Sequence, residues 1–230
     1  MSTCRPIVDI IKNRLGDVLN LRNKTIQKED GSYVSEGDLL VQSIVFDYVR
    51  KHMIEYELIS EEMAPFGDRD WDIYGSYVVL DPIDGTENFV SGLREWGVGI
   101  SIYKQGLHQE SCIYLPELDE LQITGMPIRK YKSRIIGLSS SLSKQDMLNL
   151  PELGCEYRIM GCSMFNTLSA VRGAFAVFQN VKGVNCWDIL PGLNLALEHG
   201  CTVSIDDEPY TGQMLFPVKK YKICISNLEK

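Results

Sequence analysis

An apolar, β-branched segment, residues 77–80, leads directly into the sequence Asp81-Pro-Ile-Asp-Gly-Thr. Short runs of this kind predict a buried strand. Pro82 and Gly85 predict that the strand ends there, because proline has no N–H to donate to a sheet. In α/β proteins, ligands bind in the crevice outside the ends of such strands. The segment therefore predicts an α/β fold with a functional site at this strand end.

Two carboxylates, Asp81 and Asp84, stand three positions apart at this strand end. Carboxylates so close together repel each other unless a cation lies between them. The backbone carbonyl of Ile83 completes a set of oxygen donors that suits a hard cation such as Mg²⁺. Gly85 and Thr86, at the expected start of a helix, suit a phosphate group. The alternative interpretation is a proline-containing turn with an Asp-Gly tip.

Three further acids indicate a site only when they are considered together. Glu61 follows a short predicted strand, Asp38 opens a predicted helix after a glycine-containing loop, and Asp188 begins a long apolar helix. Taken singly, Glu61 would be a solvated surface acid. The two aspartates would be caps or first-turn acids of their helices. None of the three identifies a site by itself.

The order of the expected elements predicts how the chain is organised. Strands dominate the first part, and strands alternate with helices from about Arg134 onward. This order predicts a layered α/β architecture in two sub-domains, residues 1–130 and 131–230, that form one compact unit. The expected helices cover residues 7–19, 38–53, 143–150, 163–172 and 188–199, and the expected strands cover residues 58–59, 77–80, 96–103, 111–114, 121–124, 135–138, 175–178, 201–205 and 221–225.

The charge of the chain argues against several classes of partner. Its 230 residues include 23 Lys and Arg against 31 Asp and Glu, which gives a net charge of −8. A nucleic-acid backbone or an anionic membrane requires clustered cations, so neither is expected as a partner. No stretch reaches the roughly 18 apolar residues of a membrane span. A small phosphate substrate is compatible with the charge, since bound divalent cations reverse it locally.

The cysteines and the N-terminus indicate a cytoplasmic protein. The seven cysteines are odd in number, and no two have C-x-x-C spacing, which argues against a disulfide framework and a structural zinc. The first residues lack the apolar core of a secretory signal. We therefore expect reduced thiols and a cytoplasmic location.

Together, the acidic segments resemble those of the inositol monophosphatase family, whose superfamily includes fructose bisphosphatases and 3′,5′-bisphosphate nucleotidases. The resemblance covers nearly the whole chain. It implies a layered αβαβα sandwich, a Mg²⁺-dependent phosphomonoesterase and a homodimer. The matching segments, in chain order, are Val34-Ser-Glu-Gly-Asp38, Ser60-Glu-Glu62, Asp81-Pro-Ile-Asp-Gly-Thr-Glu-Asn-Phe89 and Trp187-Asp188.

The resemblance also implies a role for each matching position. The first sub-domain would carry most metal ligands, and the second would complete the substrate pocket. Two Mg²⁺ ions would be bound, with a weaker third ion near the loop of residues 28–37. The implied roles are ligands of the first metal for Glu61, Asp81 and the Ile83 carbonyl; ligands of the second metal for Asp81, Asp84 and Asp188; positioning of the attacking water for Asp38 and Thr86; phosphate contacts for Gly85 and Thr86; and contacts in the substrate pocket for Asp84, Arg158, Gly161, Cys162, Ser163 and Asp188. The alternative for Arg158 is a structural or interface arginine.

One departure leaves the substrate open. Seven residues before Asp188, where inositol phosphatases place a substrate-binding Glu, this chain has Val181. Lys182 beside it either replaces that contact or is solvated. We therefore expect hydrolysis of a small sugar or polyol phosphate monoester. The alternatives are 3′(2′),5′-bisphosphate nucleotidase activity, fructose-1,6-bisphosphatase activity, or a non-catalytic protein- or RNA-binding role. A phosphatase with an aspartyl-phosphate intermediate is excluded because it requires Asp-x-Asp spacing.

Overall fold

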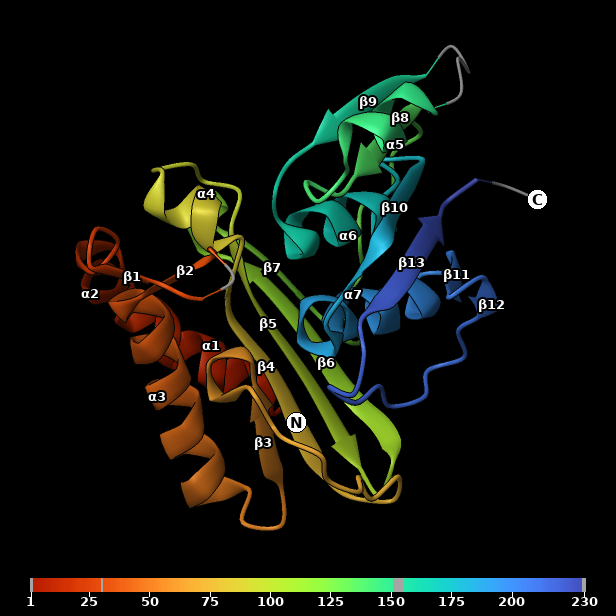
Figure 1. The fold of residues 1–230 in the computed structure, drawn as a ribbon. Coiled ribbons are helices and arrows are strands. Elements are labelled where there is room, and N and C mark those ends of the chain that lie inside the picture. The colour runs from red at the N-terminus through yellow and green to blue at the C-terminus, as the bar shows by residue number, and fades with distance from the viewer. Residues whose placement is uncertain (1, 30, 151–154, 229–230) are drawn as a thin grey trace.

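The fold is described by a computed structural model that covers residues 2–29, 31–150 and 155–228. Two β-sheets with helices between and beside them form its layers (Figure 1). Strands β3 to β7 form the first sheet in chain order. β3 and β4 are parallel and the other neighbours antiparallel. The bounds of these strands are β3 Glu57–Ser60, β4 Tyr77–Asp84, β5 Gly97–Lys104, β6 Leu107–Leu115 and β7 Glu120–Ile123.

The second sheet has six strands in the order β12-β11-β13-β10-β8-β9. β8 is parallel to β9 and to β10, and the remaining neighbours are antiparallel. A separate two-stranded hairpin precedes the first sheet. The bounds are β8 Ile135–Leu138, β9 Glu156–Ile159, β10 Val177–Val184, β11 Thr202–Ile205, β12 Glu208–Pro209 and β13 Tyr221–Ser226, and those of the hairpin are β1 Thr25–Gln27 and β2 Tyr33–Ser35.

The helices complete the layers on either side of the first sheet. Helices α1, α2 and α3 cover its outer face, and α6 and α7 lie between the two sheets (Figure 1). The bounds are α1 Cys4–Asn13, α2 Leu15–Asn20, α3 Glu36–His52, α6 Ser163–Val171 and α7 Cys186–Glu198, with the short helices η1 Glu61–Met63, α4 Thr86–Val90, η2 Pro116–Leu118 and α5 Lys144–Leu148.

Alternating side chains of β4 explain why the first sheet carries helices on both faces. Val78 and Leu80 are fully buried and pack into the core shared with α1 and α3. Tyr77 and Val79 point the other way, into the core shared with α6, α7 and the second sheet. A strand that buries both faces reads as a continuous apolar run, as observed here. The expected layered α/β fold is confirmed.

Several element boundaries differ from those expected. β4 does not stop at Pro82 but continues to Asp84. The last pair of β3 with β4 is Ser60 with Leu80, and the register with β5 shifts between Asp81 and Asp84. Pro82 therefore lies where the ladder is interrupted, so its missing N–H leaves no regular hydrogen bond unmade. The strand delivers both aspartates to its end without a break.

Other differences lie away from this strand. The first expected helix is broken at Arg14, and α7 begins at Cys186, two residues before Asp188. Strands β1, β2, β9 and β12 were not expected, because each is short and none is buried along its whole length; β1 and β12 are fully exposed. Along the chain, the last strand of the first sheet ends before residues 124–134 and the first strand of the second sheet begins after them. The division into two sub-domains stays a prediction. Among the described residues, no helix is long and apolar enough to cross a membrane.

Candidate metal and phosphate site

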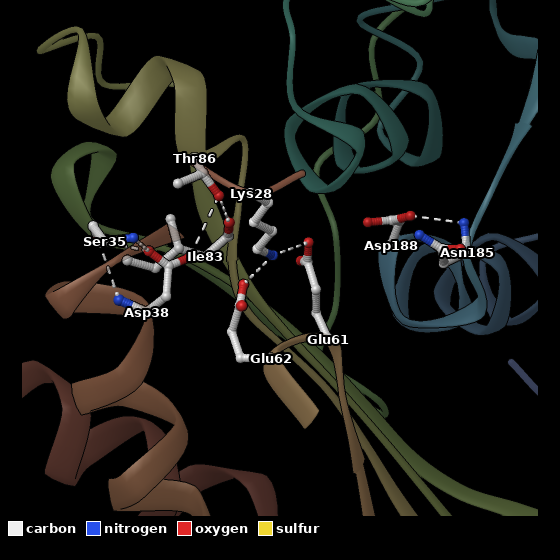
Figure 2. Close-up of polar contacts among 9 residues, drawn as sticks. All are labelled: Lys28, Ser35, Asp38, Glu61, Glu62, Ile83, Thr86, Asn185 and Asp188. Atoms are coloured by element: carbon white, nitrogen blue, oxygen red, sulfur yellow. Dashed lines mark hydrogen bonds and ion pairs between the residues drawn. The ribbon is translucent and has the colours of Figure 1, made fainter. Parts of the chain in front are cut away.

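Three carboxylates from distant parts of the chain meet between the two sheets. Glu61 begins η1 directly after β3, Asp81 lies in β4, and Asp188 lies in the first turn of α7. One carboxylate oxygen of each lies within 4.8 Å of those of the other two. Figure 2 shows the side chains of Glu61 and Asp188 facing each other across this space. The fold thus gathers residues separated by more than a hundred positions into one acidic cluster.

The environment of this cluster favours a bound cation. Asp81 is fully buried, and neither of its carboxylate oxygens accepts a hydrogen bond from the described part of the chain. Burial, followed by the charge of Glu61, raises the pKa of Asp81 well above its usual range. Burial likewise raises the pKa of Glu61 to about 8 and that of Asp188 to about 7. A buried carboxylate without donors, such as that of Asp81, fits a hard divalent cation, which binds oxygen ligands and compensates the charge of the cluster.

Asp84 lies beside this cluster but is held by protein donors. Its Oδ2 accepts hydrogen bonds from the Sγ of Cys162, at 2.8 Å, and from the backbone N–H of Met164. Cys162 is the N-cap of α6, and its Sγ also accepts a hydrogen bond from the N–H of Phe165. Burial raises the pKa of Asp84, while the hydrogen bond from Cys162 opposes that rise. The start of α6 therefore fixes the orientation of this carboxylate.

Asp38 and Thr86 approach each other next to the Ile83 carbonyl at the end of β4 (Figure 2). The hydroxyl of Thr86 donates to the Ile83 carbonyl at 3.0 Å and lies 3.4 Å from Oδ1 of Asp38. Oδ2 of Asp38 accepts hydrogen bonds from the N–H and hydroxyl of Ser35, which caps α3 in a reciprocal capping box. Burial raises the pKa of Asp38 to about 6. Asp38 therefore has two roles: one carboxylate oxygen takes part in the capping box of α3, and the other faces the hydroxyl of Thr86.

A lysine that sequence reasoning did not single out contacts the cluster. The Nζ of Lys28 lies 2.9 Å from Oε1 of Glu62 and 3.4 Å from Oε1 of Glu61 (Figure 2). Burial lowers the pKa of Lys28, but the two glutamates outweigh it and raise the pKa above its ordinary value. The sequence did indicate that the loop beginning at Lys28 approaches the site. It carried no signal that this ammonium pairs with the two glutamates.

A cavity of about 360 Å³ opens beside the acids. Asp84 and Asp188 line it, as do Gly161, Cys162 and Ser163 at the start of α6. Gly85 has a φ of +80°, and a Cβ on it would lie 2.9 Å from the Cβ of Cys162. Position 85 therefore requires glycine both for its backbone conformation and for the close approach of α6.

Two expected pocket residues do not line this cavity. Arg158 is exposed on β9, where its guanidinium pairs with Glu156 at 2.7 Å. Val181 is 42% exposed on β10 and lines a separate cavity of about 90 Å³. Both residues lie in strands of the second sheet. Their spacing from the matched motifs did not predict which way their side chains point, because the pairing of these strands decides that.

Comparisons with known proteins agree with this architecture. A model of the inositol monophosphatase family matches residues 1–227. An inositol-1-monophosphatase of Mesorhizobium japonicum is 27% identical over 82% of this chain and 77% of its own length. A Nus factor SuhB of Pasteurella multocida is 28% identical over 77% of this chain and 73% of its own.

A solved structure shares the fold at lower identity. An IMPase/NADP phosphatase complexed with Mg²⁺ and phosphate is 18% identical, with a TM-score of 0.76, over 98% of this chain and 92% of that one. At this identity, the likeness establishes the arrangement of helices and strands alone.

Proposed function

Because the chain belongs to the inositol monophosphatase family, we propose that it is a Mg²⁺-dependent phosphatase that hydrolyses a small sugar or polyol phosphate monoester. The cluster of Glu61, Asp81 and Asp188 carries this proposal, since both oxygens of the buried Asp81 lack a donor among the described residues. The Mg²⁺ in a solved structure of the same fold supports the choice of cation. We further propose a cytoplasmic homodimer, as the family resemblance implies.

The proposed metal ligands are those that the family resemblance implies, and the cluster of Glu61, Asp81 and Asp188 supports three of them. Glu61, Asp81 and the Ile83 carbonyl would hold one Mg²⁺, and Asp81, Asp84 and Asp188 would hold a second, with a third near residues 28–37. Bound Mg²⁺ supplies Lewis-acid activation of the attacking water and neutralises charge on the phosphoryl group. The Ile83 carbonyl accepts a hydrogen bond from Thr86 at 3.0 Å and would use its second lone pair for the ion.

The remaining steps belong to Asp38 and Thr86, beside the cluster, and to the start of α6. In this step the Thr86 hydroxyl turns from the Ile83 carbonyl, gives its proton to Oδ1 of Asp38 at 3.4 Å and takes up the proton of the attacking water. Burial raises the pKa of the Asp38 carboxyl, which strengthens it as a base for this transfer. Gly85 and Thr86 contact the phosphate, and Gly161, Cys162 and Ser163 contact the alcohol part of the substrate.

A relative named Nus factor SuhB motivates a second candidate. In that case the chain would be a non-catalytic member of the family that binds a protein or RNA. The net charge of −8 argues against a polyanionic partner. The acids proposed as ligands of two ions are all present, which argues against loss of catalysis.

The test is phosphate release from a panel of sugar, polyol and nucleotide phosphates, with Mg²⁺ and with a chelator. The proposal expects release that requires Mg²⁺, with sugar or polyol monoesters among the best compounds. Preference for a 3′,5′-bisphosphate nucleotide or for fructose 1,6-bisphosphate would instead support one of those two activities. No release from any compound, together with no Mg²⁺ binding by calorimetry, would contradict the proposal.

A further inference from the structure

The motif of residues 81–89 contains a buried polar side chain to which the proposed function gives no role. Asn88 lies in α4 and is 7% exposed. Its Nδ2 donates hydrogen bonds to the backbone carbonyls of Glu95 and Met160, each at 2.6 Å. Carbonyl oxygens only accept, so the atom between them has to be the amide nitrogen, the one donor of this side chain. Asn88 therefore commits its amide nitrogen to two backbone segments at once.

The two segments belong to different parts of the fold. Glu95 lies shortly before β5 of the first sheet, and Met160 follows β9 of the second sheet and leads into α6. Asn88 and Met160 are 72 positions apart in the chain. The Asn88 amide thus joins α4, which follows β4, to the segment that begins α6.

Helix α4 is itself anchored on the side of the first sheet. Phe89, the residue after Asn88, is fully buried and packs edge-to-face on Trp96, with 4.8 Å between the ring centres. The guanidinium of Arg22 lies over the Phe89 ring, 4.8 Å from its centre. Glu117 pairs with Arg22 and accepts a hydrogen bond from Nε1 of Trp96 at 2.6 Å. These contacts fix α4, so the amide of Asn88 acts from a fixed position.

Gly161 packs directly against this amide. It has a φ of +72°, and a Cβ on it would lie 2.9 Å from Oδ1 of Asn88. Glycine is therefore required at position 161 both for the backbone conformation and for the close approach of α4. Gly161, Cys162 and Ser163 line the cavity beside Asp84. The place of this cavity wall, residues 161–163, thus depends on the contact with Asn88.

A second set of contacts holds the first turn of α6, beyond Gly161. Cys162 and Met164 donate hydrogen bonds to Asp84, from the Sγ and from the backbone N–H. These contacts fix the start of α6 next to β4, whereas the peptide group before Gly161 is held by Asn88. Loss of the Asn88 amide would therefore release the cavity wall at Gly161 and leave Asp84 in place.

We propose that Asn88 is a positioning residue that aligns the cavity wall of residues 161–163 with the phosphate contacts of Gly85 and Thr86. The inference rests on the proposed phosphatase function, which assigns this wall to the alcohol part of the substrate and Gly85 and Thr86 to the phosphate. Asn88 itself does not line the cavity, so it acts through the Met160 carbonyl. Its loss weakens binding of the alcohol part and spares binding of the phosphate.

The test measures two constants for each protein in the presence of Mg²⁺. One is KM for the sugar or polyol monophosphate that the wild type hydrolyses best, and the other is Ki for inorganic phosphate. Asn88→Ala removes the amide, and Asn88→Leu keeps nearly the same volume without a hydrogen to donate. Both variants should raise KM by about tenfold and leave Ki nearly unchanged.

Asn194→Ala is the matched control. Asn194 on α7 is 4% exposed, and its Nδ2 also donates two hydrogen bonds, to the hydroxyls of Tyr103 at 2.8 Å and Ser111 at 3.2 Å. It lines a different cavity. Asn194→Ala should lower the stability of the protein but keep the ratio of KM to Ki of the wild type.

An unchanged KM in the Asn88 variants, or a rise of KM and Ki by the same factor, would overturn the inference. An equal change of the ratio in Asn194→Ala would overturn it as well. If Asn88→Ala and Asn88→Leu do not fold, Asn88→Ser, which keeps one donor, decides by the same ratio. Failure of all three variants to fold would assign Asn88 to folding and not to the alignment of the site.

The two proposals can fail separately. If monophosphates are hydrolysed but the Asn88 variants keep the wild-type ratio, the inference alone fails. If nothing is hydrolysed, the proposed function fails, and calorimetry with Mg²⁺-loaded protein then decides the inference from the Kd values of the sugar and polyol monophosphates and of inorganic phosphate. Weaker binding of the monophosphates alone by Asn88→Ala would support it. Equal changes for both kinds of compound, or no binding by the wild type, would overturn it.

Discussion

The Sγ of Cys162 donates a hydrogen bond to Oδ2 of Asp84 at 2.8 Å. This contact links the start of α6 to the end of β4 and so fixes one proposed metal ligand. Because Cys162 is 2% exposed, the thiol acts through Asp84 and not through solvent. Serine has the same donor and acceptor capacity, whereas alanine has neither.

Substitutions of Cys162 should therefore distinguish its role in orienting Asp84 from its contribution to the packing of the core. Cys162→Ala should lower kcat by about tenfold, the effect expected when one hydrogen bond to a charged group is lost. Cys162→Ser should recover most of the activity. Steady-state kinetics at several Mg²⁺ concentrations measure both variants, and equal losses in the two would contradict the orienting role.

Lys28 is expected to stabilise the metal-free protein. Its ammonium lies beside Glu61 and Glu62, so Lys28→Met removes the counter-charge of two clustered carboxylates. Without divalent cations, Tm should fall by about 2–4 °C, and Mg²⁺ should reduce that difference. Thermal unfolding in chelator and in Mg²⁺ measures the effect.

Lys24→Met is the matched control for Lys28, because Lys24 pairs with Glu36 on the surface at 3.3 Å. Exposed pairs of this kind contribute little to stability. The account of Lys28 would be wrong if both variants lost the same stability with and without Mg²⁺.

The acidic cluster predicts how stability depends on pH. Burial raises the pKa of Glu61 to about 8 and that of Asp188 to about 7. Between their unfolded values near 4 and these folded values, the native state binds more protons than the unfolded state, so stability falls as pH rises. Metal-free protein should therefore have a lower Tm at pH 8.5 than at pH 5.5, and Glu61→Gln should flatten this slope. A Tm that rises with pH over this range would contradict the assignment.

Lys130 is expected to stabilise two helices at once. Its Nζ donates to the carbonyl of Val171 at 2.7 Å, at the end of α6, and to that of His199 at 3.0 Å, at the end of α7. A cation at helix C-termini satisfies free carbonyls and complements the helix dipole. Lys130→Met should lower the free energy of unfolding by about 1–3 kcal/mol, measured by urea denaturation. The exposed Lys104 supplies the control Lys104→Met, and an equal effect of the two would refute the capping role.

The sequence predicted the layers and the acids that gather between them. Residues 77–80 form an apolar run, which predicted a buried strand, and Asp81 follows it directly. Motif order then indicated that Glu61 and Asp188 belong with Asp81. Their metal-binding roles stay predictions, whereas their proximity is a property of the structure.

The remaining features of the fold and the site depend on contacts between distant segments, which no local sequence pattern predicts. The pairing of Lys28 with Glu61 and Glu62 joins a hairpin loop to η1. The exposed positions of Arg158 and Val181 follow from the register of β9 and β10. From the sequence, Pro82 predicted the end of the strand. That prediction was wrong because the register of β4 with β5 already shifts at this point, so the strand tolerates a residue without an N–H.

The most direct test of the account is Mg²⁺-dependent phosphate release by Asp81→Asn. Asp81 is the fully buried acid whose oxygens lack donors among the described residues, and it is proposed to contact both ions. The control Asp47→Asn changes an exposed acid of α3. We predict that Asp81→Asn folds but loses about three orders of magnitude in rate, while Asp47→Asn matches the wild type. Wild-type turnover by folded Asp81→Asn would contradict the proposed metal site.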